Sequence, residues 1–155
     1  MTTAQIAPVQ IKRSRADVYR SKVQIRLALD EAGPEIGKLL AENGVVLPGV
    51  TWGKVFPHWL IATAGDQVIG CLQIMPVKPI GRCEFLYVRK SAGFKERAIA
   101  IRKLMVQGIA TCHAAGCAYV AGVVDLRNKK FEDVLTKLNF VRAPDHMVLV
   151  KRLVD

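Results

Sequence analysis

Apolar and polar positions alternate along several short stretches of the chain, and this pattern predicts strands. Residues 23–29 read Val-Gln-Ile-Arg-Leu-Ala-Leu, so an apolar side chain recurs at every second position. The apolar stretches 59–63 and 68–74 are joined by Ala-Gly-Asp-Gln, whose turn-forming residues predict a β-hairpin. Further apolar stretches predict strands at 83–88, 118–124 and 147–150, and the composition of 118–124 is typical of a strand buried on both faces.

Helical spacing of apolar positions predicts three helices between these strands. The first follows Asp30, which can cap it, and ends at Asn43-Gly44. The second is long and runs from about Glu96 to Ala115. Its apolar face consists of Ile101, Leu104, Met105, Ile109 and Cys112. One side of the third helix carries Phe131, Val134, Leu135 and Leu138.

Segments rich in Gly and Pro separate these elements. Residues 45–57 predict a loop, and Pro76, Pro79 and Gly81 are expected to interrupt the chain before the strand at 83–88. The element order is therefore β-α-β-β-β-α-β-α-β. Such an alternation of strands and helices predicts an α/β (α+β) domain.

Length and composition limit the class of protein. The 155 residues suit one domain with its own core, and 51% hydrophobic with 23% charged residues is the balance of a soluble globular protein. No apolar run approaches the ~18 residues that span a bilayer, and the N-terminus lacks the apolar region of a secretory signal. We therefore expect a cytoplasmic protein without a membrane segment. The four cysteines lack paired metal-ligand spacing and are expected to be buried free thiols.

The formal net charge of +10 favours anionic partners. Five of the basic residues fall within residues 1–22, which we expect to form a basic N-terminal arm, with the folded domain at 23–155. A nucleotide cofactor, an acidic protein surface and nucleic acid would all suit this charge, and composition does not choose among them.

The pattern most suggestive of chemistry is a strand, a short basic loop and a long helix. Small residues at Ala98 and Ala100 would let a ligand approach the backbone, and the first turn of a helix has unpaired N–H groups. Lys95 and Arg97 add full positive charges. The sequence therefore predicts an anion site suited to a pyrophosphate. The alternative to an anion site is a helix whose first turn is basic and whose small residues serve only packing.

At this point the chain resembles the GNAT family of N-acetyltransferases. Residues 94–100, Phe-Lys-Glu-Arg-Ala-Ile-Ala, are similar to the family signature Arg/Gln-x-x-Gly-x-Gly/Ala. Asn128, Phe131, Val134 and Asn139-Phe140 match the spacing of its second block, Asn-x-x-Ala-x-x-Leu-Tyr-x-x-x-Gly-Phe. The resemblance covers about residues 23–152 and implies a single GNAT-like domain. Its central sheet would be mixed, mostly antiparallel, flanked by helices and splayed where an acyl-CoA enters.

Three positions depart from the family pattern. Ala98 replaces a glycine, so one Cβ must fit beside the pyrophosphate. Leu135 stands where many members carry a tyrosine that protonates the departing CoA thiolate. Asn139 replaces the glycine before Phe140, a milder change because asparagine tolerates left-handed backbone. The first two changes bear on catalysis rather than on the fold.

The resemblance also implies roles for individual residues. Glu84 would accept the proton of the attacking amine, directly or through water, although an edge-facing or salt-bridged glutamate is an open alternative. Backbone groups near Tyr87 and Val88 would hold the pantetheine arm, and Tyr87 also suits simple packing. The expected cofactor-binding set is Tyr87, Val88, Lys95, Glu96, Arg97, Ala98, Ile99, Ala100 and Asn128, with acetyl-CoA as cosubstrate and no metal.

Three functions therefore stay open. The first is transfer of an acetyl group from acetyl-CoA to an unidentified amine by direct attack. The second is a catalytically silent GNAT-like module that binds acyl-CoA, which Ala98 and Leu135 would explain. The third is a basic interaction protein that binds nucleic acid or an acidic protein. The family resemblance also makes a homodimer a possible assembly.

Overall fold

A computed structural model describes residues 22–46, 58–123, 129–142 and 148–153. Most of the expected basic arm, residues 47–57 of the loop expected at 45–57, and Asn128 lie outside these ranges. The strands and helices in chain order are β1 (Val23–Leu27), the 3₁₀ helix Asp30–Ala32, α2 (Gly33–Glu42), β2 (Trp59–Ala64), β3 (Gln67–Met75), β4 (Ile80–Val88), α3 (Phe94–Ala114), β5 (Tyr119–Val123), α4 (Lys129–Lys137), β6 (Val141–Arg142) and β7 (Val148–Arg152).

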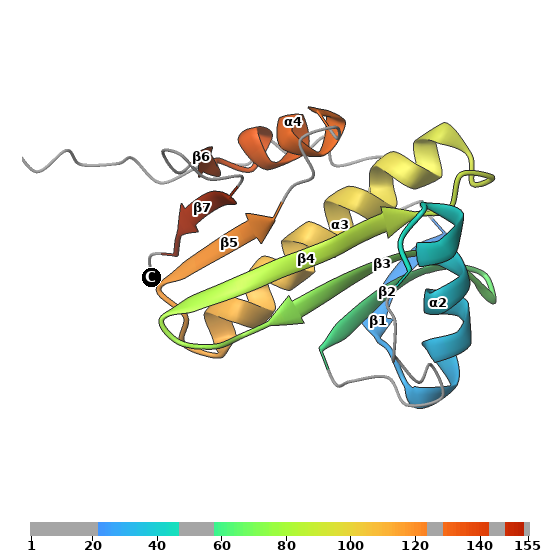
Figure 1. The fold of residues 1–155 in the computed structure, drawn as a ribbon, viewed down its shortest axis with the longest axis horizontal. Coiled ribbons are helices and arrows are strands. Elements are labelled where there is room, and N and C mark those ends of the chain that lie inside the picture. The colour runs from blue at the N-terminus through green and yellow to red at the C-terminus, as the bar shows by residue number, and fades with distance from the viewer. Residues whose placement is uncertain (1–21, 47–57, 124–128, 143–147, 154–155) are drawn as a thin grey trace, which may run out of the picture.

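The strands form one seven-stranded sheet in the order β1-β2-β3-β4-β5-β7-β6 (Figure 1). Only β4 and β5 run parallel among these paired strands, and all other neighbours are antiparallel. This confirms the expected mixed, mostly antiparallel sheet and its α/β class. The short β6 was not expected, because two residues carry no readable alternation and are placed only by pairing with Leu149 and Val150 of β7.

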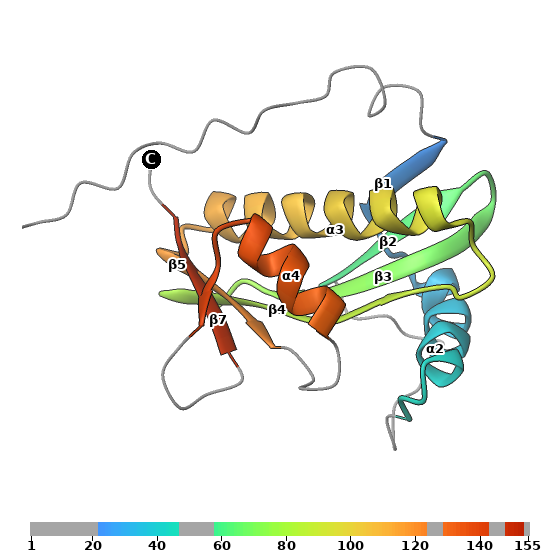
Figure 2. The same cartoon turned by 90° about the horizontal axis from the view of Figure 1, so that it is seen from above.

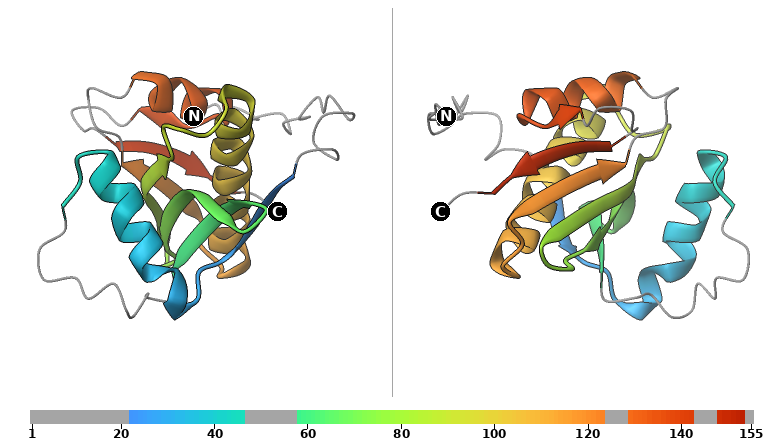
Figure 3. Two further views of the ribbon diagram at one scale, coloured as in Figure 1. Left: turned by 90° about the vertical axis from the view of Figure 1, so that its right-hand side faces the viewer. Right: turned by 60° about the vertical axis from the view of Figure 1, so that its left-hand side comes forward.

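Helices cover both faces of the sheet and divide the core in two. Helices α3 and α4 pack on one face, where Leu104 and Leu135 are fully buried. Helix α2 packs on the other face through Ile36, Leu39 and Leu40 (Figure 3). Figure 2 shows α3 lying along the sheet with α4 beside it. Strand β2 contributes side chains to both cores, because successive side chains of a strand point to opposite faces of the sheet.

The long helix α3 confirms the expected apolar face and adds a feature to it. Leu104, Met105 and Cys112 are buried, while Ile101 and Ile109 are half-buried against the same core. Gly108 lies at the centre of this face. A Cβ there would lie 2.8 Å from Leu72 Cδ2, so a glycine is needed for the close approach of α3 to β3.

Some element boundaries differ from the sequence expectation. Gly81 does not interrupt the chain but lies within β4, where a Cβ would come 2.5 Å from Cys112 Sγ. Gly81 is therefore needed for close packing against α3 rather than for a turn. Asp30 does not cap α2. It begins a 3₁₀ helix, and α2 follows Ala32 with a proline in its first turn.

Candidate functional site

Strands β4 and β5 part in the middle of the sheet. Their register runs from Ile80↔Tyr119 to Cys83↔Gly122. Strand β4 then continues to Val88, and within the described residues its part from Glu84 onward has no partner in β5 (Figure 1). The backbone groups of this segment that point away from β3 are therefore available to a ligand lying between the strands.

A β-bulge lies at this point of β4. Two steps along β3, from Cys71 to Gln73, stand opposite three steps along β4, from Tyr87 to Glu84. The bulge residue Phe85 has a φ of 51°, in the left-handed region that a bulky aromatic residue rarely adopts. Its ring stacks on Trp59 at a centroid distance of 6.1 Å. Strained backbone of this kind persists only where the surroundings hold it, and it clusters at functional sites.

Glu84 is the first residue of β4 beyond the last β4–β5 pair. It stands opposite Gln73, which stands opposite Trp59, so all three side chains lie on the face that α2 covers. The Glu84 side chain is 13% exposed and forms an ion pair with the half-exposed Arg82. The structure thus places Glu84 at the splay, with its carboxylate beside the guanidinium of Arg82.

Tyr87 and Val88 direct their side chains to opposite faces of β4. Tyr87 packs beside the core under α2, and Val88 packs beside the core under α3. Both residues pair with β3, at Cys71 and Gly70. Burial raises the pKa of the neighbouring Cys71 thiol to about 12, and this thiol donates to the Phe85 carbonyl at 3.7 Å.

Helix α3, which follows β4, begins about one turn before the small residues Ala98 and Ala100. Helix α3 starts at Phe94, and its first hydrogen bond runs from the Arg97 amide to the Gly93 carbonyl at 2.9 Å. The amides of Phe94, Lys95 and Glu96 therefore have no acceptor within the helix. Those of Ala98 to Ala100 lie one turn further in, where helical amides bond back to carbonyls four residues earlier.

The expected cofactor-binding residues on α3 consequently fall into two groups. Lys95 and Glu96 present amides at the helix start, and Lys95 is exposed there. Arg97 is half-buried, and its Nε atom is buried without a hydrogen-bond partner among the described residues. Ala98 is exposed on the second turn, Ile99 packs partly against the core and Ala100 is fully buried. The helix start thus separates Lys95 and Glu96, whose amides have no acceptor within the helix, from Ala100, which faces the core.

Glu96 has a structural role at the same terminus. Its Oε2 accepts the Gly93 N–H at 3.3 Å, which caps the helix from within. A glycine followed three residues later by a glutamate is a recognisable helix-capping pattern. It would have predicted from the sequence that α3 begins directly after Gly93.

Helix α4 covers the point where β4 and β5 part. Leu135 is fully buried, and a Cβ on Gly122 would lie 2.9 Å from its Cδ1. The side chain at this position is apolar and cannot donate a proton. Asn139 has a φ of 63°, which confirms that asparagine here serves the left-handed backbone role of glycine.

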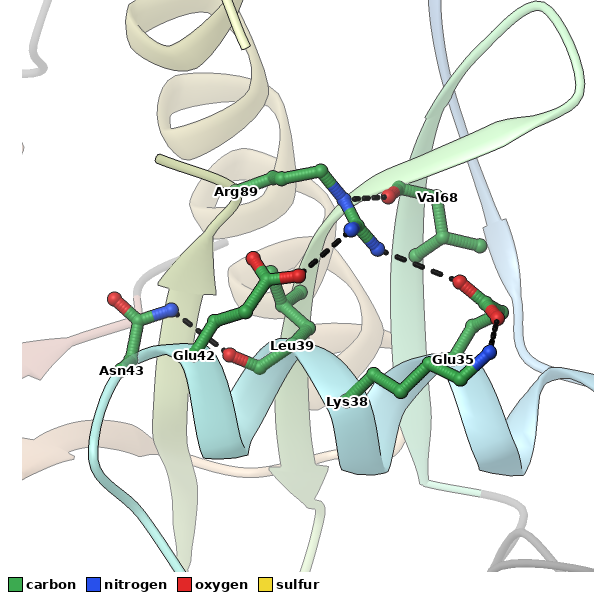
Figure 4. A network of polar contacts seen from close by, with 7 residues as sticks. All are labelled: Glu35, Lys38, Leu39, Glu42, Asn43, Val68 and Arg89. Atoms are coloured by element: carbon green, nitrogen blue, oxygen red, sulfur yellow. Dashed lines mark hydrogen bonds and ion pairs between the residues drawn. The ribbon is translucent and has the colours of Figure 1, made fainter. Parts of the chain in front are cut away.

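Arg89 was not singled out by its sequence, although it directly follows β4. Its side chain lies between β3 and α2, where it contacts Val68, Glu42 and Glu35 (Figure 4). The only available signal was indirect: two glutamates of α2, Glu35 and Glu42, are spaced seven residues apart and so share one face of that helix.

The described part of the chain contains neither a metal-ligand cluster nor a membrane-spanning helix. No group of three His, Cys, Asp or Glu side chains there is arranged to hold a metal ion. None of the helices described combines the length and apolar character that a bilayer-crossing segment needs. All four cysteines are buried free thiols, as expected.

Comparisons with known proteins identify the fold. No protein-family model matches the chain, and no curated protein matches its sequence. Among solved structures, Ard1 from Thermoplasma volcanium superposes with a TM-score of 0.70 at 12% identity, over 86% of this chain and 99% of that one. The PaiA N-acetyltransferase from Thermoplasma acidophilum, in complex with coenzyme A, gives 0.67 at 14% identity over 84% and 99%. A GNAT-family acetyltransferase from Streptococcus pneumoniae gives 0.65 at 15% over 85% and 99%. The chain therefore has the GNAT fold, which it shares with these acetyltransferases.

Proposed function

We propose that the protein is an acyl-CoA-dependent N-acyltransferase that moves an acetyl group from acetyl-CoA to an amine. The observation that carries this proposal is the parting of β4 from β5 beyond Cys83 and Gly122, next to a helix terminus with unbonded amides. Together these features offer a slot for an extended thioester arm and a site for its phosphates. The coenzyme A bound to the PaiA relative supports the same cosubstrate.

The chain supplies groups for each part of acetyl-CoA. The amides of Phe94, Lys95 and Glu96 and the charge of Lys95 would hold the pyrophosphate. Backbone groups of Tyr87 and Val88 would hold the pantetheine arm. A backbone N–H near Val88 would polarise the thioester carbonyl, where negative charge develops during attack.

In the proposed reaction, the amine nitrogen attacks the thioester carbon and the carbon–sulfur bond breaks. Glu84 accepts the amine proton, directly or through water, once its carboxylate is released from Arg82. The thiolate leaves with the electron pair of the broken bond. Because Leu135 has no acidic proton, the thiolate must take its proton from water or from another group.

A catalytically silent acyl-CoA-binding module is the second candidate, and one specific observation favours it. Leu135 is fully buried against Gly122, so the described side chain of α4 at this point provides packing and no general acid. Nucleic-acid binding through residues 1–22 remains a third prediction, which concerns residues outside those described.

Calorimetric titration with acetyl-CoA, followed by an assay of CoA release, separates the candidates. We expect saturable acetyl-CoA binding and slow release of CoA with polyamines, aminoglycosides or basic and acidic peptides as acceptors. Binding without release for any acceptor would support the silent module. No binding at millimolar acetyl-CoA would overturn both.

A further inference from the structure

Arg89 connects three parts of the molecule that surround the proposed acyl-CoA site. Its main-chain N–H donates to the Ile69 carbonyl at 2.7 Å, and its Nε donates to the Val68 carbonyl at 3.0 Å. Its Nη1 donates to Glu42 at 2.7 Å and its Nη2 to Glu35 at 3.4 Å (Figure 4). The Arg89 side chain is only 14% exposed, whereas the carboxylates of Glu35 and Glu42 are 40% and 37% exposed.

The carboxylates of Glu35 and Glu42 connect Arg89 to α2. Glu35 and Glu42 lie two helical turns apart on one face of α2, and the guanidinium bridges them. The hydrogen bond from Lys38 and the nearby positive charges of Lys38 and Arg89 lower the pKa of Glu35, which keeps it ionised at neutral pH. A guanidinium suits this task because its planar fork holds several acceptors at once, which a lysine cannot do.

Helix α2 covers the face of the sheet that carries the proposed chemistry. Phe85 and Tyr87 are packed beside the core under α2, and Glu84 lies on the same face. The position of α2 therefore sets the room beside Glu84 in which an acceptor amine would bind.

Arg89 also begins the turn that leads to the start of α3. The Ala92 N–H donates to the Arg89 carbonyl at 3.2 Å, and Gly93 precedes the first helical residue, Phe94. Only this short turn separates Arg89 from the amides proposed to bind pyrophosphate. Its guanidinium is occupied by Val68, Glu42 and Glu35, so Arg89 does not itself serve as a phosphate ligand.

We propose that Arg89 is a positioning residue that couples the acceptor side, under α2, to the cofactor side, at the turn before α3. This coupling rests on the proposed binding of acetyl-CoA. When acetyl-CoA binds at the turn, it holds Arg89 in place and so restricts the motion of α2. Because coupling between two sites is reciprocal, a correctly positioned α2 in turn raises the affinity for acetyl-CoA.

The test measures acetyl-CoA affinity and amide exchange of α2 together. In the unmodified protein, acetyl-CoA should slow hydrogen–deuterium exchange of residues 33–42, although none of them is a proposed CoA ligand. Arg89→Met should abolish this protection and weaken the acetyl-CoA Kd by about tenfold, within the usual range of coupling between sites. Arg89→Lys, which keeps the charge but loses the fork, should fall between the two.

Matched variants on α2 identify the contact responsible. Glu42→Gln should weaken binding in the same direction, and adding it to Arg89→Met should cause no further loss, since the shared contact is already gone. Lys38→Met removes the other ion pair of Glu35 but keeps both carboxylate contacts of Arg89, and it should leave the Kd unchanged. If Arg89→Met fails to fold, the double variant Glu35→Gln, Glu42→Gln carries the same test, because both side chains are partly exposed.

The outcomes separate this inference from the proposed function. An unmodified protein that does not bind acetyl-CoA overturns the proposed function and the coupling with it. Binding that Arg89→Met and the double variant leave unchanged, with α2 still protected, overturns the coupling alone. A merely structural role would lower the melting temperature of Arg89→Met without altering either readout of the folded protein.

Discussion

Cys83 of β4 and Gly122 of β5 are the last register partners of the two parallel strands, and Glu84 is the first residue beyond them. The hydrogen-bonded ladder therefore ends where the candidate proton acceptor begins. A carboxylate at this point lies on the face that α2 covers, beside β4 backbone that has no partner in the described part of β5. Its role can be tested by substitution at Glu84 and at its partner Arg82.

Glu84→Gln should slow acetyl transfer by about 10² or more, because loss of a general base typically costs a factor of 10² to 10⁴. The variant should also flatten the rise of the rate with pH, while acetyl-CoA affinity stays unchanged. Steady-state assays of CoA release between pH 6 and 9 measure both effects. Arg82→Met is the companion variant: it frees the Glu84 carboxylate and should raise the rate modestly. A Glu84→Gln variant as fast as the unmodified protein would remove Glu84 from the mechanism.

Lys95→Glu should weaken acetyl-CoA binding by about tenfold or more. It replaces a cation with an anion beside the free amides at the start of α3, where the helix dipole and side-chain charges each contribute ~0.3–1 kcal/mol. Arg102→Glu is a control with the same charge change two turns further along α3, beyond most of the screened range of ~8–10 Å. Calorimetric Kd values for the two variants should differ clearly. Equal losses would point to the net charge of the molecule rather than to a site at residues 94–96.

Leu135→Tyr tests whether a general acid is missing. Leu135 is fully buried against Gly122, so the larger ring should lower the free energy of unfolding by ~1–3 kcal/mol. Leu135→Phe is the matched control because it adds the ring without the hydroxyl. We expect similar stability losses in urea unfolding but faster CoA release for the tyrosine variant. Equal rates for the two variants would show that the hydroxyl does not reach the thiolate.

Burial should make Cys71 unreactive at ordinary pH. Desolvation raises the pKa of its thiol to about 12 in the folded protein, so the reactive thiolate is scarce near pH 8 and forms only as the pH approaches 12. Because an unfolded thiol ionises near its ordinary value, alkaline pH should favour unfolding through this group. Modification of Cys71 by a thiol reagent at pH 8, measured at that residue by peptide mapping, should be slow in the native protein and fast in denaturant. If Cys71 is unreactive in the native state, a Cys71→Ser variant should react with the reagent at the same rate as the unmodified native protein. Modification of Cys71 in the native protein at pH 8 would contradict the prediction.

The position of α3 shows which of the residues expected at the pyrophosphate lie at the helix start and which lie in the core. The small residues Ala98 and Ala100 were expected to border the pyrophosphate, but α3 begins at Phe94 and buries Ala100 in the core. A charge introduced at Ala100 would therefore disrupt packing before it could report on a ligand. The capping contact between Gly93 and Glu96 decides where the free amides lie.

The sequence by itself determined the order of the main strands and helices, the β2–β3 hairpin and the buried faces of α3 and α4. These follow from local periodicity and turn residues, which are readable without knowing what packs against them. Only the tertiary structure decided where β4 leaves β5, that Phe85 adopts a left-handed bulge, and that Arg89 turns toward Glu35 and Glu42. Strand register, a bulge and a contact across more than forty residues depend on partners distant in the chain, so no local pattern of apolar and polar residues encodes them.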